Sequence, residues 1–422
     1  MTVLIKQATI VAPSSDLNGL KKDLLIENGS ISRVADSLDA PGATVIKSDN
    51  LHVSIGWFDM HANFRDPGFE YKEDLDSGMA VAANGGFTGV ACMPSTEPAI
   101  DTKSGVDYIR NKTKGNLVDV HVIGAISKGR KGVDLAEMFD MHKAGAKAFS
   151  DDKNSIANAD LLKRALLYSK GFDGLIIHFA QDNSIAHDGM MHEGKVSTGL
   201  GLKGLPSLAE EVMLARDLFL LEYTDARLHF STVSTAGGVE LIRQAKKKGL
   251  QVTAEVAAHN LVLDDSYLEQ FDANYKVMPP LRGRVDQEAL TEGLRDGTID
   301  AICSDHNPEN EENKKCELDH AEFGMTGQET CYAAVNTHLG KQLTTEILVS
   351  SLALRPRQIL GLETPTISEG TPANLTLFDP DIEWEYNTSV SFSKSHNSPF
   401  LGKTLKGKVV AVLNNGQLAL TN

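Results

Sequence analysis

The sequence predicts an α/β protein with a TIM-type (β/α)8 barrel and a small β-sandwich domain formed by both chain termini. Three observations support this. Residues 54–365 alternate short apolar runs with helix-length segments, whereas residues 1–53 and 366–422 contain β-like runs broken by Gly, Asn and Asp. The chain has 422 residues, more than one hydrophobic core usually supports. Strands that alternate with helices are typical of a parallel barrel.

The two ends of the chain have the pattern of β-hairpins. At the N-terminus, VLIKQATIVA, DLLIENGSISRVA and ATVIKSD are short runs separated by turn residues. At the C-terminus, ANLTLFDPD and KTLKGKVVAVLNNGQL follow the same pattern, with an Asn-Gly turn. Short alternating runs bounded by such residues indicate strands. Because two β-rich ends flank a different middle, we expect them to form one domain together.

Eight apolar runs in the middle of the chain have the length of buried parallel strands. They are residues 53–59, 87–93, 118–124, 145–150, 174–179, 226–231, 251–256 and 299–304. Helical patterns lie between them, and the clearest covers residues 207–222, where Ser207 and Glu210 are spaced as a capping box. In such barrels the reactive residues follow the C-terminal ends of the strands. Polar residues at those ends are therefore candidate site residues.

Several predicted strands end at residues with metal-binding chemistry. These residues are His61, Asp151, Asp152, His178, Thr232, Asp305 and His306. Taken singly, each is more simply a structural histidine or a helix N-cap, but their common position at one end of the barrel favours a shared site. Imidazole nitrogen and carboxylate oxygen are the ligands of hydrolytic zinc centres, where an open position holds water. The pattern therefore predicts a barrel of the metal-dependent hydrolase kind.

Longer motifs make a family resemblance specific. FRDPGFEYKEDLDSG, AANGGFTGVACMPST, GLKGLPSLAEEV, VTAEVAAHN, NYKVMPPLR and GTIDAICSDHNP follow one another along the chain. Together they resemble the bacterial dihydroorotases of the amidohydrolase superfamily. The resemblance implies a (β/α)8 barrel with a small β domain from both termini. It also implies zinc as cofactor and the interconversion of N-carbamoyl-aspartate and dihydroorotate in pyrimidine biosynthesis.

The resemblance also implies roles for individual residues. The implied metal ligands are His61, Asp152, His178 and Asp305. Asp305 would also be the catalytic acid-base, and Arg65 would hold the substrate carboxylate. Asp151 stays open as an alternative to Asp152 for the bridging carboxylate. The family's remaining ligand histidines are replaced here by Asn63 and Thr232.

Three further substrate-binding positions depart from the family pattern. Ser95 and Met278 stand where asparagines are expected, and Glu309 stands where a histidine is expected. A carboxylate at 309 would repel an anionic substrate. Amide and hydroxyl oxygens, as in Asn63 and Thr232, are poorer zinc ligands than imidazole. We therefore expect at most one weakly bound ion, or none.

Two interpretations of these departures stay open. The first is a degenerate active site, with a structural or regulatory role beside aspartate transcarbamoylase and doubtful turnover of a small molecule. In that case His178, Asp152 and Asp305 would persist as a buried hydrogen-bond network, and Arg65 would pair with a nearby carboxylate. The alternative is an active zinc-dependent cyclic-amide hydrolase that uses a single or divergent metal site. The resemblance also suggests a homodimer.

Composition indicates an ordinary globular protein and limits the classes of partner. Lys plus Arg number 41 against 57 Asp plus Glu, a net charge of -16, which disfavours nucleic-acid binding. No apolar run approaches the length of a membrane span, and the N-terminus lacks the features of a signal peptide. The four cysteines form no CxxC pair and are expected to be reduced thiols. We therefore expect a cytoplasmic protein.

Overall fold

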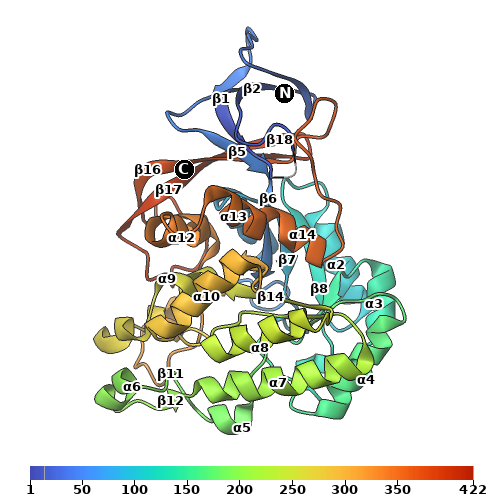
Figure 1. Cartoon of the computed structure of the whole chain (residues 1–422), viewed down its shortest axis with the longest axis vertical. Helices are drawn as coiled ribbons and strands as arrows, with labels where there is room; N and C mark the ends of the chain where they lie inside the picture. Colours follow the sequence, from blue (N-terminus) through green and yellow to red (C-terminus); the bar gives the residue numbers. More distant parts are fainter. Residues whose placement is uncertain (14, 422) are drawn as a thin grey trace.

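A computed structural model of the chain describes residues 1–13 and 15–421. It contains a parallel barrel and a separate sheet built from both termini. In Figure 1 the blue N-terminal and red C-terminal strands lie together at the top of the view, and the barrel with its green and yellow helices lies below. The predicted fold class is therefore confirmed.

Eight parallel strands form the barrel, in the same order in space as in sequence. They are β6 (Trp57–Ala62), β7 (Phe87–Cys92), β8 (Asp119–Gly124), β9 (Ala148–Phe149), β10 (Ile176–His178), β13 (Leu228–Phe230), β14 (Val252–Ala257) and β15 (Ala301–Cys303). A parallel bridge between Ala62 and His306 joins the first strand to the segment that follows the last. The barrel is therefore nearly closed, and the ends of all eight strands surround one mouth.

Helices follow the strands and cover the barrel. The longer ones are α1 (Leu75–Asn84), α2 (Lys103–Thr113), α3 (Met138–Ala144), α4 (Ala159–Lys170), α7 (Ser207–Thr224), α8 (Ala236–Lys247), α10 (Arg284–Asp296) and α12 (Cys331–Leu339). The shorter ones are α5 (Asn183–Ala186), α6 (Lys195–Leu200), α9 (Ala258–Val262), α11 (Glu311–Lys314), α13 (Thr345–Val349) and α14 (Arg355–Ile359). A π-helix, Ser350–Leu354, joins α13 to α14. The short strands β11 (Met191–His192) and β12 (Gly204–Leu205) pair within one loop.

An apolar cluster occupies much of the barrel interior, beside buried polar groups such as Glu255. A buried cluster inside it includes Phe58, Ile123 and Ile177 from the strands, together with Ile359 and Leu360 from the region of α14. Side chains therefore fill the barrel as a packed core.

None of the helices in the described part of the chain combines the length and apolar character that a membrane span requires.

The terminal sheet joins strands from both ends of the chain. Its members are β1 (Thr2–Val11), β2 (Lys21–Glu27), β3 (Ser30–Ala35), β4 (Thr44–Ile46), β5 (His52–Ile55), β16 (Leu375–Tyr386), β17 (Lys403–Asn414) and β18 (Gln417–Leu420). All eight belong to one hydrogen-bonded sheet, in which β5 pairs with β16 in antiparallel register. This pairing ties the N-terminal part of the sheet to the C-terminal part.

The first predicted barrel strand, residues 53–59, is wrong in its limits. It is two strands, since β5 belongs to the terminal sheet and β6 to the barrel. Gly56 separates them, and its N–H donates to the carbonyl of Asn374 at 2.9 Å. A Cβ atom on Gly56 would lie only 2.0 Å from Thr88 Oγ1. Both strands are largely buried, so hydrophobic periodicity alone does not mark the boundary between them.

The capping box predicted at the start of α7 is also wrong. The helix begins at Ser207 after Pro206, and no side chain caps it. Glu210 is buried and accepts hydrogen bonds from the backbone N–H groups of Ser234 and Thr235, both at 3.0 Å. It therefore anchors the loop that follows β13 at the barrel mouth instead of capping its own helix.

Candidate active site

A buried polar cluster occupies the mouth of the barrel, where the sequence predicted a site. His61 lies near the end of β6, Asp152 follows β9, and Asp305 follows β15. Their exposed fractions are 0%, 4% and 3%. Below them lies the apolar barrel core, so these groups interact in surroundings of low dielectric constant.

His61 is held between two carboxylates. Its Nε2 lies 2.7 Å from Asp152 Oδ1, and its Nδ1 lies 3.2 Å from Glu255 Oε1. Burial opposes a charged imidazole, but the hydrogen bonds to Asp152 and Glu255 prevail and raise the pKa of His61 to about 10. Both ring nitrogens of His61 therefore face carboxylate oxygens in this arrangement.

Lys153 also belongs to the cluster, although sequence reasoning did not single it out. Its Nζ forms an ion pair with Asp305 Oδ1 at 2.8 Å and donates to Thr232 Oγ1 at 3.0 Å. The ammonium also lies 5.2 Å from the centre of the Phe179 ring. The only signal in the sequence is its position directly after Asp152. Thr232 therefore acts as a hydrogen-bond acceptor for a side-chain cation.

His178 lies in the barrel wall with both ring nitrogens engaged. Its Nδ1 lies 2.6 Å from Asp217 Oδ2, and its Nε2 accepts the backbone N–H of Ile156 at 2.9 Å. Asp217 is held in turn by Arg216, whose Nε donates to Asp217 Oδ1 at 2.8 Å. The imidazole thereby joins the loop after β9 to α7. This network is separate from the one around His61.

Asn63 and Asp151 differ in whether their side-chain oxygens have hydrogen-bond partners. Asn63 is 2% exposed, and its Oδ1 has no hydrogen-bond partner among the described residues. Asp151 accepts the backbone N–H groups of Ile126 and Ser127 at 2.9 and 3.0 Å. It therefore supports the loop after β8, and of the two candidate carboxylates it is Asp152 that faces His61.

Arg65 pairs with the carboxylate of Glu309. Its Nη2 lies 2.9 Å from Glu309 Oε1, and Lys72 Nζ lies 2.6 Å from Glu309 Oε2. Asn313 also donates to Glu309 Oε2, at 2.8 Å. Glu309 therefore neutralises two cations at the mouth, and Lys72 is a second residue that sequence reasoning missed.

The other two predicted substrate positions are buried or half-buried. Ser95 donates its hydroxyl to Asp152 and so belongs to the polar cluster. Met278 packs beside an apolar cluster that contains Ala186, Leu205 and Ala209. Ser95 is thus brought together with Asp152, whereas Met278 extends an apolar wall.

The residues present do not fit the two-zinc centre that the resemblance implies. Within residues 1–13 and 15–421, no three His, Cys, Asp or Glu side chains are arranged to hold a metal ion. His61 and His178 use both nitrogens in other contacts. The ammonium of Lys153 lies against Asp305. A catalytic zinc ordinarily needs three good protein ligands.

Comparison with known proteins identifies the family. A family model described as Dihydro-orotase-like matches residues 52–237. The chain is 44% identical over 421 residues to the dihydroorotase of Acetivibrio thermocellus, covering 99% of both chains. It is also 44% identical over 422 residues to that of Pelotomaculum thermopropionicum, covering 100% of this chain and 99% of the other. The chain belongs to the dihydroorotase family. The resemblance found in the sequence motifs is therefore confirmed.

Solved structures show that this dihydroorotase-family chain shares its fold with hydantoinases. The L-hydantoinase (dihydropyrimidinase) from Arthrobacter aurescens matches with a TM-score of 0.86 at 24% identity, covering 99% of this chain and 96% of that one. The dihydropyrimidinase from Brevibacillus agri matches with a TM-score of 0.84 at 22% identity, covering 100% and 95%. At these identities the likeness concerns the fold.

The backbone at the mouth of this dihydroorotase-family barrel is strained at four non-glycine residues. Arg65, Asp152, Thr232 and Asp305 have φ angles of 61°, 54°, 48° and 48°. Left-handed conformations are uncommon for such residues, most of all for β-branched threonine. They persist where the surrounding structure enforces them, and they cluster at functional sites. Four loops therefore hold one strained residue each at the same site.

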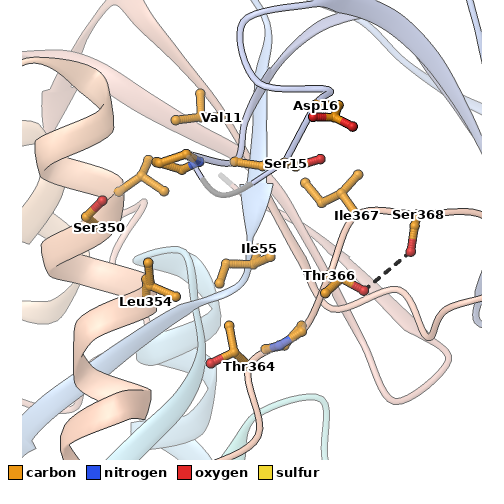
Figure 2. Close-up of a pocket in the computed structure, with 14 residues that line it drawn as sticks. Val11, Ser15, Asp16, Ile55, Ser350, Leu354, Thr364, Thr366, Ile367 and Ser368 are labelled. Carbon is orange, nitrogen blue, oxygen red and sulfur yellow. Dashed lines mark hydrogen bonds between the residues drawn. The ribbon is translucent and has the colours of Figure 1, made fainter.

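A cavity lies away from the mouth, between the terminal sheet and the π-helix. It measures about 390 Å³ and is lined by residues 11–13, 15, 16, 55, 349, 350, 354 and 364–368. Figure 2 shows Val11, Ile55 and Leu354 around it, with Thr366 bonded to Ser368. Asp16 is the one ionisable side chain among these described lining residues. The cavity therefore lacks an acid-base pair, and in this dihydroorotase-family chain the mouth stays the candidate active site.

Proposed function

We propose that this chain is a cyclic-amide hydrolase of pyrimidine biosynthesis that interconverts dihydroorotate and N-carbamoyl-aspartate. The observation that carries the proposal is 44% identity, over nearly the whole chain, to proteins named dihydroorotase. Asp305 and Arg65 at the barrel mouth support it, because they have the chemistry that ring opening of a carboxylate-bearing amide requires.

Asp305 is the group suited to proton transfer. Its Oδ2 lies 3.8 Å from His259 Nε2, and its Oδ1 lies 2.8 Å from Lys153 Nζ. A carboxylate there can take a proton from the attacking water and return it to the ring nitrogen as the C–N bond breaks. Arg65 is suited to hold the substrate carboxylate with its guanidinium. Glu309 must leave Arg65 before the substrate can bind in this way.

The test is the hydrolysis of dihydroorotate by the purified protein, measured without and with added zinc. Asp305→Asn removes the proton-transfer group, and any activity left in it comes from contaminating host enzyme. Asp319→Asn is the matched control, because that side chain is 58% exposed on the same loop. Turnover in the wild type and Asp319→Asn, but not in Asp305→Asn, supports the hydrolase. Background rates in all three proteins overturn it.

A second candidate function is favoured by the ion pairs at the mouth. Glu309 neutralises Arg65 and Lys72, and Lys153 neutralises Asp305. A site whose charges are paired internally has less need of a ligand. We propose, as this second candidate, that the chain is a structural or regulatory partner of aspartate transcarbamoylase.

Size-exclusion chromatography with light scattering tests the partnership. The chain is mixed with the aspartate transcarbamoylase of the same organism, and each protein is also run alone. A joint peak together with background turnover of dihydroorotate favours the second candidate. Separate peaks count against it, and the run of the chain alone reports whether it forms the expected homodimer.

A further inference from the structure

We propose that the ammonium group of Lys153 takes the place of a metal ion at the barrel mouth, so that this chain does not retain zinc. Lys153 bears on the proposed function because it supplies positive charge beside Asp305. Metal binding and turnover are nevertheless separate observables.

The ammonium is held as a bound cation would be. Its contacts are Asp305 Oδ1 at 2.8 Å and Thr232 Oγ1 at 3.0 Å. Both residues stand at positions where the family resemblance implies metal ligands. The Phe179 ring, 5.2 Å away, adds a cation–π contact. An ammonium has three donors and no acceptor, so it matches a pocket of oxygen atoms and an aromatic face.

The charges around Lys153 also favour a resident cation. Asp152, Asp305 and Glu255 are buried carboxylates with exposed fractions of 4%, 3% and 0%. His61 Nε2 lies 2.7 Å from Asp152 Oδ1 but 3.6 Å from Asp305 Oδ1, so Lys153 Nζ, at 2.8 Å, is closer to Asp305 than the imidazole is. A divalent ion placed between Asp152 and Asp305 would lie close to the ammonium and would be repelled by it.

Thr232 and Lys153 are complementary. A hydroxyl at 232 is a weak zinc ligand, but it is a good acceptor for an ammonium group. The side chain of Lys153 is 16% exposed and that of Asp305 is 4% exposed, so the ion pair is poorly screened by water. The hydroxyl at 232 and the ammonium at 153 are therefore complementary parts of one site.

The experiment measures zinc binding by the full-length protein and by Lys153→Ala. Each protein is freed of metal, titrated with Zn²⁺ by calorimetry, and then loaded with Co²⁺ to record the absorption spectrum of a bound ion. We expect the purified wild type to retain no zinc and to bind added Zn²⁺ only weakly. We expect Lys153→Ala to bind at least about tenfold more tightly, the equivalent of one pKa unit of like-charge repulsion.

Three further variants keep the result interpretable. Lys153→Gln removes the charge but keeps a hydrogen-bonding side chain. It can be measured in place of the alanine variant if that variant misfolds. Lys163→Ala makes the same change of charge on the outer surface of α4, where the lysine pairs with Asp160, and it should bind zinc like the wild type. Asp305→Asn combined with Lys153→Ala should abolish the gained binding if the ion occupies this site.

Several outcomes would overturn the inference. They are stoichiometric zinc in the purified wild type, equal zinc affinity in the wild type and both Lys153 variants, or gained binding that survives Asp305→Asn. Turnover by the zinc-free wild type would uphold both this inference and the hydrolase. Turnover that requires tightly bound zinc would uphold the hydrolase and overturn the role of Lys153. An inert wild type whose Lys153 variants gain zinc binding would overturn the hydrolase and uphold the role of Lys153.

Discussion

Replacing Glu309 with glutamine should open Arg65 to an anionic ligand. Glu309 is 5% exposed and contacts Arg65 Nη2 at 2.9 Å and Lys72 Nζ at 2.6 Å. Glutamine keeps the size and one hydrogen-bond acceptor of the side chain but loses its charge. The guanidinium would then be the strongest available site for a carboxylate at the mouth.

The size of the effect follows from the geometry. A ligand carboxylate on the free edge of the Arg65 guanidinium would lie about 6 Å from the Glu309 carboxylate, and at an effective dielectric constant of about 20 the repulsion is about 2.8 kcal/mol. Since 1.4 kcal/mol corresponds to tenfold in affinity, Glu309→Gln should tighten binding on the order of 100-fold. It should also lower the free energy of unfolding by about 2 kcal/mol, because two charged hydrogen bonds are weakened.

The assay is isothermal calorimetry with orotate, a ring that carries a carboxylate, and with uracil, which lacks one. Only orotate should gain affinity in Glu309→Gln. Glu312→Gln, on the same loop, makes the same change of charge without contact to Arg65 and should behave like the wild type. If orotate binds equally to all three proteins, or if uracil gains as much as orotate, Arg65 is not the carboxylate site.

Two further predictions concern stability. Burial lowers the pKa of His121 to about 4, so the unfolded chain binds this proton more readily and stability should fall as the pH drops from about 6.5 to 4. His121→Phe should flatten that part of the curve in urea denaturation at stepped pH, and an unchanged slope would contradict the assignment. Gly56→Ala places a Cβ atom 2.0 Å from Thr88 Oγ1 and 2.1 Å from Asn374 Oδ1 and should cost about 1–3 kcal/mol or more. Gly199→Ala meets no atom within 4 Å and should leave the thermal midpoint unchanged or higher; equal midpoints for both variants would refute the argument.

The barrel could be predicted from sequence because its strands are buried on both faces. Phe87–Cys92 is buried along its whole length, and such a strand appears in the sequence as an unbroken apolar run. The same property hid the boundary inside residues 53–59, because His52–Ile55 and Trp57–Ala62 are both largely buried. Only Gly56 marks the change of sheet, and its role depends on Thr88 and Asn374, which are distant in sequence.

The site was predicted in its location and only in part in its contacts. His61, Asp152 and Asp305 meet as expected, because the ends of parallel strands face one mouth. Lys153 was missed because lysine is seldom buried, and its contacts with Thr232 and Asp305 join three different strands. Glu309 was expected to repel a substrate. Its pairing with Lys72 depends on how two loops meet, which local sequence does not specify.

The charged side chains at the mouth form compensating ion pairs. A metal ion would offset the buried carboxylates Asp152 and Asp305, and without positive charge these groups would repel each other in a medium of low dielectric constant. Lys153 supplies such a charge beside Asp305, as His61 does beside Asp152. At the other edge of the mouth, Glu309 offsets the cations that would otherwise await an anion. The Lys153 variants therefore test cation binding at the site, and the Glu309 variant tests anion binding. Because zinc is measured for the first and orotate for the second, either prediction can fail without the other.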